Sequence, residues 1–442
     1  MQNNQQRFDA VVIGGGIGGL TTAAFLARQG KRVQVLEKAS AIGGRARTKE
    51  QDGFYFNIGA HALYRGGQGI KILRELGIQP QGHVPQVSGG YAIHGGRKHT
   101  LPFGSISMLT TDLFGLSAKM EVGRLLGSLA KIDGQPLMKM SMSEWLNKTL
   151  TDKTARELVL ATFRLSTYVN APDLMSAGTA IEQLKLALTE SVLYLDGGWQ
   201  TLVDGLRNVV AAAGATITTD ARVEAVERDK KGAVKAVRLA DRQRLTTEVV
   251  IIAASPKEAA ALVENGGKTS LARYAKEAIP VKAAALDIAL SELPVKKATF
   301  ALGIDAPLYL SVHSLAAKVA PEGSALVSLL KYLPLKHETS SEEDERELEA
   351  LMDLVQPSWR EVILHKRFLP AVTTLNAIPL ASKSGVEGRP SPQVDDIGGL
   401  YVVGDWVGNE GLLVDASLAS AKQAATMVMA RSNVSVSAHA AD

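Results

Sequence analysis

Residues 9–19 read Asp-Ala-Val-Val-Ile-Gly-Gly-Gly-Ile-Gly-Gly, and this stretch decides the fold class. After Asp9 the chain is short, apolar and β-branched, as in a buried parallel strand. The glycines that follow have the spacing G-x-G-x-x-G. They lead into a helix that is predicted to continue to about residue 29, because its apolar residues recur at helical spacing. A second apolar strand, residues 32–36, ends at Glu37. This order of elements predicts a βαβ unit that binds a dinucleotide.

The glycine turn has a physical task at each position. Gly14 permits the tight turn, Gly16 lets the backbone approach a pyrophosphate, and Gly19 lets the helix pack closely on the sheet. The free N–H groups at the start of the helix, around Ile17 and Gly18, then face the phosphates together with the positive end of the helix dipole.

Two later stretches have the pattern of apolar and polar residues that is expected of the same α/β domain. Residues 218–254 consist of alternating runs separated by polar turns, which predicts two or three antiparallel strands and then an apolar strand. Residues 399–403 form another buried-type strand, and a closing helix is predicted over residues 416–430. The predicted fold class is α/β, with a Rossmann-type domain assembled from discontinuous segments and an interleaved α+β substrate domain. The predicted boundaries are 1–90, 197–269 and 386–434 for the first domain, and 91–196 and 270–385 for the substrate or lid domain.

The stretch after the second strand identifies the nucleotide. Glu37 is predicted to accept hydrogen bonds from the adenosine ribose hydroxyls, with Lys38 beside it at the cofactor. Five residues later comes Gly43-Gly44-Arg45-Ala46-Arg47-Thr48. Here the sequence resembles the flavin amine oxidase and phytoene desaturase superfamily, which implies FAD as the cofactor. By this resemblance Gly43, Gly44 and Arg45 lie along its pyrophosphate and flavin side, where a guanidinium pairs well with phosphate oxygens.

The C-terminal segment carries the second part of the resemblance. An apolar strand runs into Gly404-Asp405, and a loop and a helix rich in small residues follow. The resemblance implies that Asp405 hydrogen-bonds the ribityl or phosphate portion of FAD, and Asp415 is predicted to cap the last helix. Further residues that the resemblance places at the cofactor are Gly59, Ala60, His61, Val223, Gly404, Gly411, Leu412, Leu413 and Ala416.

Composition excludes several kinds of site. The 442 residues contain no cysteine, which excludes disulfides, Cys-ligated metals and a flavin attached through Cys, so FAD is expected to bind non-covalently. No two of the 8 histidines have metal-ligand spacing on a recognisable element, so no metal is expected. The net charge of +4, without a basic block, gives no sign of a nucleic-acid partner.

The sequence also shows no pattern typical of a signal peptide or a membrane span. The N-terminus is polar, with no apolar region of the kind a signal peptide has, and no window reaches the roughly 18 to 20 apolar residues of a membrane span. We therefore expect a cytoplasmic protein, and amphipathic helical runs within 108–129 allow peripheral membrane association through a lipid-facing lid. The sequence does not predict the oligomeric state.

Three functions stay open at this point. The C-terminal segment 404–421 and the step Gly197-Gly198-Trp199 resemble the phytoene desaturase branch, which implies hydride transfer between an apolar, carotenoid- or lipid-like substrate and flavin N5. The first alternative is an amine oxidase that releases hydrogen peroxide. The second is a non-catalytic binding protein that resembles the Rab GDP-dissociation inhibitors. His61, in a segment expected near the flavin, is the one candidate catalytic residue.

Overall fold

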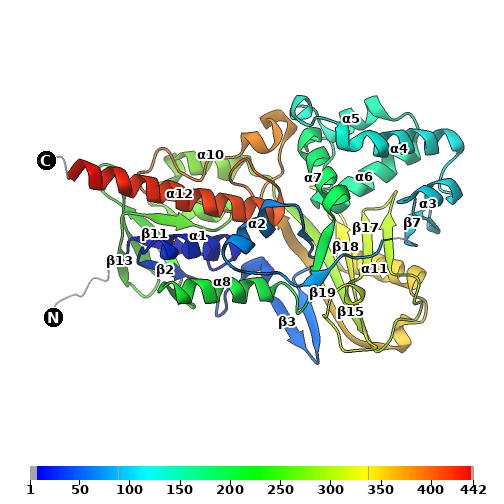
Figure 1. The fold of residues 1–442 in the computed structure, drawn as a ribbon, viewed down its shortest axis with the longest axis horizontal. Helices are drawn as coiled ribbons and strands as arrows, with labels where there is room; N and C mark the ends of the chain where they lie inside the picture. Colours follow the sequence, from blue (N-terminus) through cyan, green and yellow to red (C-terminus); the bar gives the residue numbers. More distant parts are fainter. Residues whose placement is uncertain (1–6, 88, 337, 440–442) are drawn as a thin grey trace.

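The fold is described from a computed structural model, which covers residues 7–87, 89–336 and 338–439, with side chains up to residue 431. The chain forms two lobes that lie side by side (Figure 1). The lobe with both chain ends contains α1, α2, α8 and α12, and the other contains α3–α7 above a large sheet.

The helices are α1 Ile17–Arg28, α2 Gln68–Glu75, α3 Ser105–Thr110, α4 Leu116–Ser128, α5 Met142–Thr149, α6 Lys153–Thr167, α7 Ala177–Glu190, α8 Gln200–Ala212, α9 Pro256–Leu262, α10 Ser270–Glu277, α11 Ser341–Val355 and α12 Leu413–His439. The strands are β1 Ala10–Ile13, β2 Val33–Leu36, β3 Thr48–Gln51, β4 Phe54–Asn57, β5 Leu63–Tyr64, β6 Gly82–His83, β7 Tyr91–His94, β8 Arg97–Thr100, β9 Val192–Leu195, β10 Thr216–Thr218, β11 Val223–Arg228, β12 Val234–Leu239, β13 Arg244–Thr246, β14 Val250–Ile252, β15 Val281–Leu290, β16 Phe300–Gly303, β17 Leu308–Val312, β18 Ala325–Tyr332, β19 Ile363–Leu375 and β20 Leu400–Val402.

A five-stranded parallel sheet forms the centre of the first lobe, which we call the nucleotide lobe. Its strand order is β10-β2-β1-β14-β20, so the start, the middle and the end of the chain meet in one sheet. All residues of β1 and β2 are buried, as expected for parallel strands covered on both faces. The predicted α/β class with discontinuous Rossmann-type segments is confirmed.

The helices of the nucleotide lobe pack directly on this sheet. α1 follows β1 and contacts both α12 and α8. The close packing depends on Gly19, because a Cβ there would lie 2.0 Å from the carbonyl oxygen of Gly14. The antiparallel strands β11, β12 and β13 form a separate small sheet, as the run at 218–254 predicts.

The second lobe, which we call the substrate lobe, is built on a seven-stranded mixed sheet. Its order is β19-β15-β18-β17-β16-β7-β8, and only the β16–β7 pair is parallel among the described pairs. Its long strands β15 and β18 are buried almost throughout, because helices α4–α7 and α11 pack around the sheet.

A three-stranded sheet, β5-β9-β6, joins sequence segments from both predicted domains. β9 comes from the stretch assigned to the lid, whereas β5 and β6 come from the stretch assigned to the nucleotide-binding domain. The division of the chain at the predicted boundaries stays a prediction.

Asp415 does not cap the last helix, so that prediction is wrong. α12 begins at Leu413, and Asp415 therefore lies in its first turn. The Asp415 Oδ1 accepts a hydrogen bond from the backbone N–H of Gly69 at 2.6 Å, and the side chain is 1% exposed. A Cβ at Gly67 would lie 2.2 Å from the other carboxylate oxygen. The carboxylate thus caps the start of α2, a contact between segments that are distant in the sequence.

Candidate functional site

A cavity of about 940 Å³ runs from the carboxyl ends of the parallel strands to the seven-stranded sheet. Ile13, Leu36, Ala253 and Val403, at or just after the ends of β1, β2, β14 and β20, lie on its wall. Ligands of open α/β sheets bind at this edge, next to the point where the strand order reverses. Most predicted cofactor residues line this cavity, namely Gly14, Gly16, Ile17, Gly18, Gly19, Glu37, Lys38, Gly43, Gly44, Arg45, Gly59, Ala60, His61, Val223, Gly404, Asp405 and Leu413.

The glycine turn has the geometry that phosphate binding requires. Gly14 has a φ of +108°, in the region that favours glycine, and a Cβ there would lie 2.5 Å from the carbonyl oxygen of Ala253. A Cβ at Gly16 would meet no atom within 4 Å, so the backbone is open to the cavity at that point. The start of α1 therefore presents its free N–H groups to the cavity wall.

Glu37 is fixed by the same turn. Its carboxylate accepts hydrogen bonds from the backbone N–H of Gly15 at 2.7 Å and of Ala39 at 2.9 Å. Because a carboxylate has about four acceptor sites, these two bonds leave it able to accept from a ribose hydroxyl as well. Lys38, the next residue, also lines the cavity and forms an ion pair with Glu258 at 2.7 Å.

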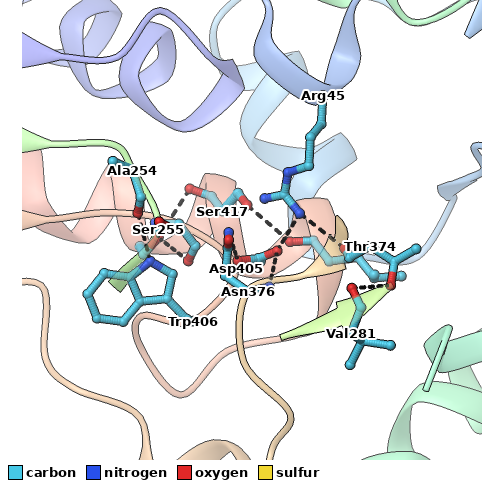
Figure 2. A network of polar contacts seen from close by, with 12 residues as sticks. Arg45, Ala254, Ser255, Val281, Thr374, Asn376, Asp405, Trp406 and Ser417 are labelled. Carbon is cyan, nitrogen blue, oxygen red and sulfur yellow. Dashed lines mark hydrogen bonds and ion pairs between the residues drawn. The ribbon is translucent and has the colours of Figure 1, made fainter. Parts of the chain in front are cut away.

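Arg45 and Asp405 line the cavity and belong to a network of polar contacts (Figure 2). The Arg45 Nη1 donates to the Asp405 Oδ2 at 2.7 Å and to the carbonyl oxygen of Thr374 at 3.1 Å. The Asn376 side chain donates to the other Asp405 oxygen at 2.8 Å. Asp405 is 1% exposed, so this cluster offsets the cost of burying its charge. It also connects three segments that are distant in the sequence.

His61 lies at the opposite end of the cavity from Glu37. Its Nδ1 donates to the carbonyl oxygen of Gly59 at 2.8 Å, and its ring centre lies 4.8 Å from that of Trp199. Burial, together with the smaller effects of the positive charges of Arg45 and Arg367, lowers the pKa of His61 to about 4. The imidazole is therefore neutral at neutral pH, and the contact with the Gly59 carbonyl oxygen assigns the proton to Nδ1.

Asn57 and Thr48 hold the tryptophan beside His61. The Asn57 Oδ1 accepts from the backbone N–H of Trp199 at 3.0 Å and from the Thr48 hydroxyl at 2.7 Å. A Cβ at Gly198 would lie 2.7 Å from the Thr48 side chain, so this glycine is required for the close approach. The sequence Gly197-Gly198-Trp199 indicates a tight turn here, but the contacting residues Asn57 and Thr48 are distant in the sequence and could not be predicted from it.

Several residues of the site could not be found from the sequence. Tyr168 lines the cavity, and its hydroxyl donates to the carbonyl oxygen of Ala60 at 3.1 Å. Its backbone has a φ of +62° at the end of α6. Asn376 and the wall residues Ala283, Leu330 and Val372 come from strands or loops without any motif. Their only signal is apolar alternation, which does not tell a cavity wall from ordinary core.

Three predicted cofactor residues do not lie on the cavity wall. Gly411 is exposed, Leu412 is 1% exposed within the hydrophobic core of the substrate lobe, and Ala416 is fully buried. The reason is helical geometry, because Leu413 and Ser417 share one face of α12 and it is that face which lines the cavity. A direct role in FAD binding for these three residues stays a prediction.

His365, on β19, is a histidine that does not line the cavity. Its ring nitrogens lie 3.1 Å from the Gln51 side chain and 3.0 Å from the Asp52 carboxylate. Within the described residues, no group of three or more His, Asp or Glu is placed to hold a metal ion.

The comparisons with known proteins identify the class. The family model described as "Flavin containing amine oxidoreductase" matches residues 17–429, and the chain belongs to this family. It is therefore an FAD-dependent oxidoreductase.

Curated relatives match parts of the chain. A phytoene desaturase from Cercospora nicotianae is 28% identical over 57% of the chain and 46% of its own length. An all-trans-retinol 13,14-reductase from Rattus norvegicus is 48% identical over a shorter stretch, 14% of the chain and 10% of its own length. The chain thus spans about half the length, or less, of these relatives.

A solved structure matches nearly the whole chain. An oxidoreductase from Methanosarcina mazei has a TM-score of 0.73 and 20% identity, over 95% of this chain and 99% of that one. At this identity the likeness shows the fold alone.

The residues of the cavity fit FAD. The open backbone at Gly16 and the N-terminus of α1 suit a pyrophosphate, and Glu37 and Val223 lie on the wall near β2, where an adenosine would extend. The opposite end, at His61 and Trp199, would then receive the flavin ring. The chain has no cysteine to which a flavin could be attached.

Proposed function

We propose that the chain transfers hydride between FAD and an apolar, isoprenoid-like substrate, in the direction of desaturation. The observation that carries this proposal is the composition of the wall around His61. That wall includes Ala60, Ala283, Leu330, Val372 and Leu413, with the rings of Tyr168 and Trp199. A wall of this kind binds hydrocarbon by excluding water and offers little hydrogen bonding to a polar substrate.

The charges of the cavity support the same substrate class. Besides Asp405, which pairs with Arg45, the acids on the wall are Glu37, Glu224 and Glu258, near β2, β11 and α9 at the nucleotide end. Because Asp405 is already paired, an ammonium group near His61 would find no free carboxylate on that part of the described wall. It would lose its hydration without gaining an ion pair.

The chemistry follows from this arrangement. In a desaturation, one C–H bond of the substrate gives up its electron pair as hydride, the adjacent carbon loses a proton, and a C=C bond forms between them. FAD, when bound, takes the hydride at N5. The apolar wall orients the chain of the substrate and excludes water, and we propose that Nε2 of the neutral His61 accepts the proton. With a pKa of about 4, His61 then releases the proton readily at neutral pH.

An amine oxidase is the second candidate function. Two aromatic rings, Tyr168 and Trp199, line the wall near His61, and aromatic faces attract cations. The absence of a free acid on that part of the described wall argues against it. A non-catalytic role like that of the GDP-dissociation inhibitors is not retained, because the chain belongs to a family of flavin-containing oxidoreductases.

The test is anaerobic reduction of the FAD-loaded protein by two panels of compounds. Detergent-solubilised polyisoprenoids are expected to bleach the flavin absorbance, and primary or secondary amines are not. Hydrogen peroxide release with an amine under air would instead establish the second candidate.

A variant pair sharpens this test. Val372→Asp places a charge on the wall and is expected to abolish bleaching by the polyisoprenoid while FAD content stays unchanged. Leu364→Asp makes the same kind of change on the same strand, β19, at a side chain that is 50% exposed and away from the wall, and is the control. Equal bleaching in both variants would contradict the proposed substrate site.

A further inference from the structure

The three most exposed large apolar side chains of the described residues, and a fourth exposed one, lie on two adjacent helices of the substrate lobe. Ile106 and Leu109 on α3 are 79% and 73% exposed, and Leu116 and Met120 on α4 are 70% and 57% exposed. No residue of α3 is buried. We call Ile106, Leu109, Leu116 and Met120 the apolar knob. Apolar groups clustered in this way mark an interaction surface, because scattered exposed residues would not share adjacent elements.

The outer face of α4 is separate from the face that packs in the core. Ala118, Val122 and Leu125 are buried and lie on one side of the helix. Leu116 and Met120 are one turn apart on the opposite side, and Gly123 and Gly127 continue that line, with open space where their Cβ atoms would be. Two large apolar residues on the outward face of a surface helix have no role in the packing of the lobe.

Basic side chains without acidic partners surround the knob. Lys119 and Arg124 flank the outer face of α4, and Arg97 and Lys98 lie on β8, which is bound to the α3–α4 link by the Thr111 hydroxyl donating to Thr100 at 2.7 Å. None of these four cations forms an ion pair with an acid in the part of the chain that the structure describes.

Two acids lie on the same part of the lobe. Asp112 pairs with His99 at 3.0 Å, and Glu121 accepts from the backbone N–H of Thr151 at 2.9 Å. The four cations outnumber these two acids, so the surface combines exposed apolar groups with a net positive charge. This combination is complementary to anionic headgroups over hydrocarbon.

One hydrophobic cluster connects this surface with the flavin end of the cavity. Leu113 and Val122, beneath the knob, belong to the same cluster as Ala60 and Leu330 on the cavity wall. No helix of the described residues is long and apolar enough to cross a bilayer. Contact with lipid would therefore be made from one side, through the knob.

We propose that α3 and the outer face of α4 dock on an anionic lipid surface and hold the apolar core of the substrate lobe against it. This inference rests on the proposed function, because an isoprenoid-like substrate is dissolved in such a surface. The occupant is a lipid bilayer, since the exposed apolar groups lie beside four cations that form no ion pair with any acid of the described residues.

Co-sedimentation of the FAD-loaded protein with vesicles tests the proposal. We expect binding to vesicles of phosphatidylcholine with phosphatidylglycerol, and much weaker binding to phosphatidylcholine alone. The double variant Ile106→Asp/Leu116→Asp should bind at least about tenfold more weakly, because two apolar insertions become charges. Lys119→Gln/Arg124→Gln should lose about fivefold for each charge removed and with it the preference for anionic lipid. Leu315→Asp, at a 62% exposed leucine on another element, is the matched control and should bind like the unaltered protein.

Two results would overturn the proposal. One is equal vesicle binding by the double variant and by Leu315→Asp. The other is a dimer in solution that the double variant dissociates, which would assign the knob to a second copy of the chain. Flavin bleaching by detergent-solubilised substrate separates this inference from the proposed function. If docking is wrong the bleaching persists without vesicle binding, and if the substrate is wrong vesicle binding persists without bleaching.

Discussion

The two ends of the cavity are built from different materials. At the nucleotide end the wall is mainly backbone, with Gly14 at a φ of +108° and an open Gly16 beside the start of α1. At the flavin end the wall is side chains from many elements, among them Tyr168, Leu330 and Val372. Backbone geometry tolerates almost no change, whereas a wall of apolar side chains tolerates substitutions of similar volume. The difference indicates that the cofactor is fixed by the fold and the substrate by the choice of side chains.

The first prediction tests how strictly the nucleotide end depends on glycine. Gly19→Ala places a Cβ 2.0 Å from the Gly14 carbonyl oxygen, so β1 and α1 must move apart. We expect a loss of more than about 3 kcal/mol in the free energy of unfolding, together with loss of FAD. Urea unfolding and FAD content after gel filtration measure both.

The control for this prediction is Gly123→Ala, on the open face of α4. Alanine is favoured there by up to about 1 kcal/mol and should leave FAD content unchanged. A stable, FAD-loaded Gly19→Ala protein would mean that the two ends do not differ as described.

The second prediction concerns a buried ion pair in the substrate lobe. Asp287 is 3% exposed, and it accepts from Arg367 at 2.6 Å and from the Ser328 hydroxyl at 2.8 Å. Arg367 also donates to the carbonyl oxygen of Asn57, at the end of β4. Asp287→Ala leaves the guanidinium without its anion and should cost about 3 kcal/mol in urea unfolding. Ser328→Ala should cost about 1 kcal/mol, and equal effects would show that the charge is not what matters.

The third prediction uses pH to test the contact between α12 and α2. Burial raises the pKa of Asp415 from 3.8 to about 6, and the hydrogen bond from Gly69 offsets part of the rise. Because the folded state binds the proton more tightly than the unfolded state, ionisation of Asp415 lowers stability as pH rises from about 4 to above 6. Asp415→Asn removes this cost. At pH 8 the free energy of unfolding of the variant should therefore be about 2 kcal/mol higher than that of the unaltered protein, and this difference should shrink towards pH 4. Asp395→Asn, at an exposed acid, should show no such trend in urea unfolding.

The fourth prediction sharpens the comparison at the flavin end. His61→Ala removes one polar side chain from the wall and should leave FAD content and stability nearly unchanged, while the rate of flavin reduction falls about tenfold or more. Since burial lowers the pKa of His61 to about 4, the rate should show no ionisation of this group between pH 5 and 8. Stopped-flow reduction at several pH values measures this. If the variant loses FAD but the FAD-loaded fraction is reduced at an unchanged rate, His61 has a structural role and not a catalytic one.

The two ends also differ in what could be predicted from the sequence. The glycine turn and Glu37 were predictable because each follows its strand directly, so spacing along the chain gives the geometry. Arg45 and Asp405 were predictable by resemblance, but their pairing with each other at 2.7 Å was not, because it depends on β20 lying beside β14. Tyr168 and Asn376 have no local signal, since long-range packing alone brings them to the cavity.

The strand order of the parallel sheet has a consequence for how the protein is made. β1 occupies a central position, yet its partner β14 begins at Val250, and β20 on the far side of β14 begins at Leu400. During synthesis the first βαβ unit therefore emerges long before the strand that covers its open edge. An unpaired, fully apolar strand edge is prone to aggregation. The nucleotide-binding turn is thus synthesised long before the strands that complete its sheet, so a slowly translated chain should depend strongly on chaperones.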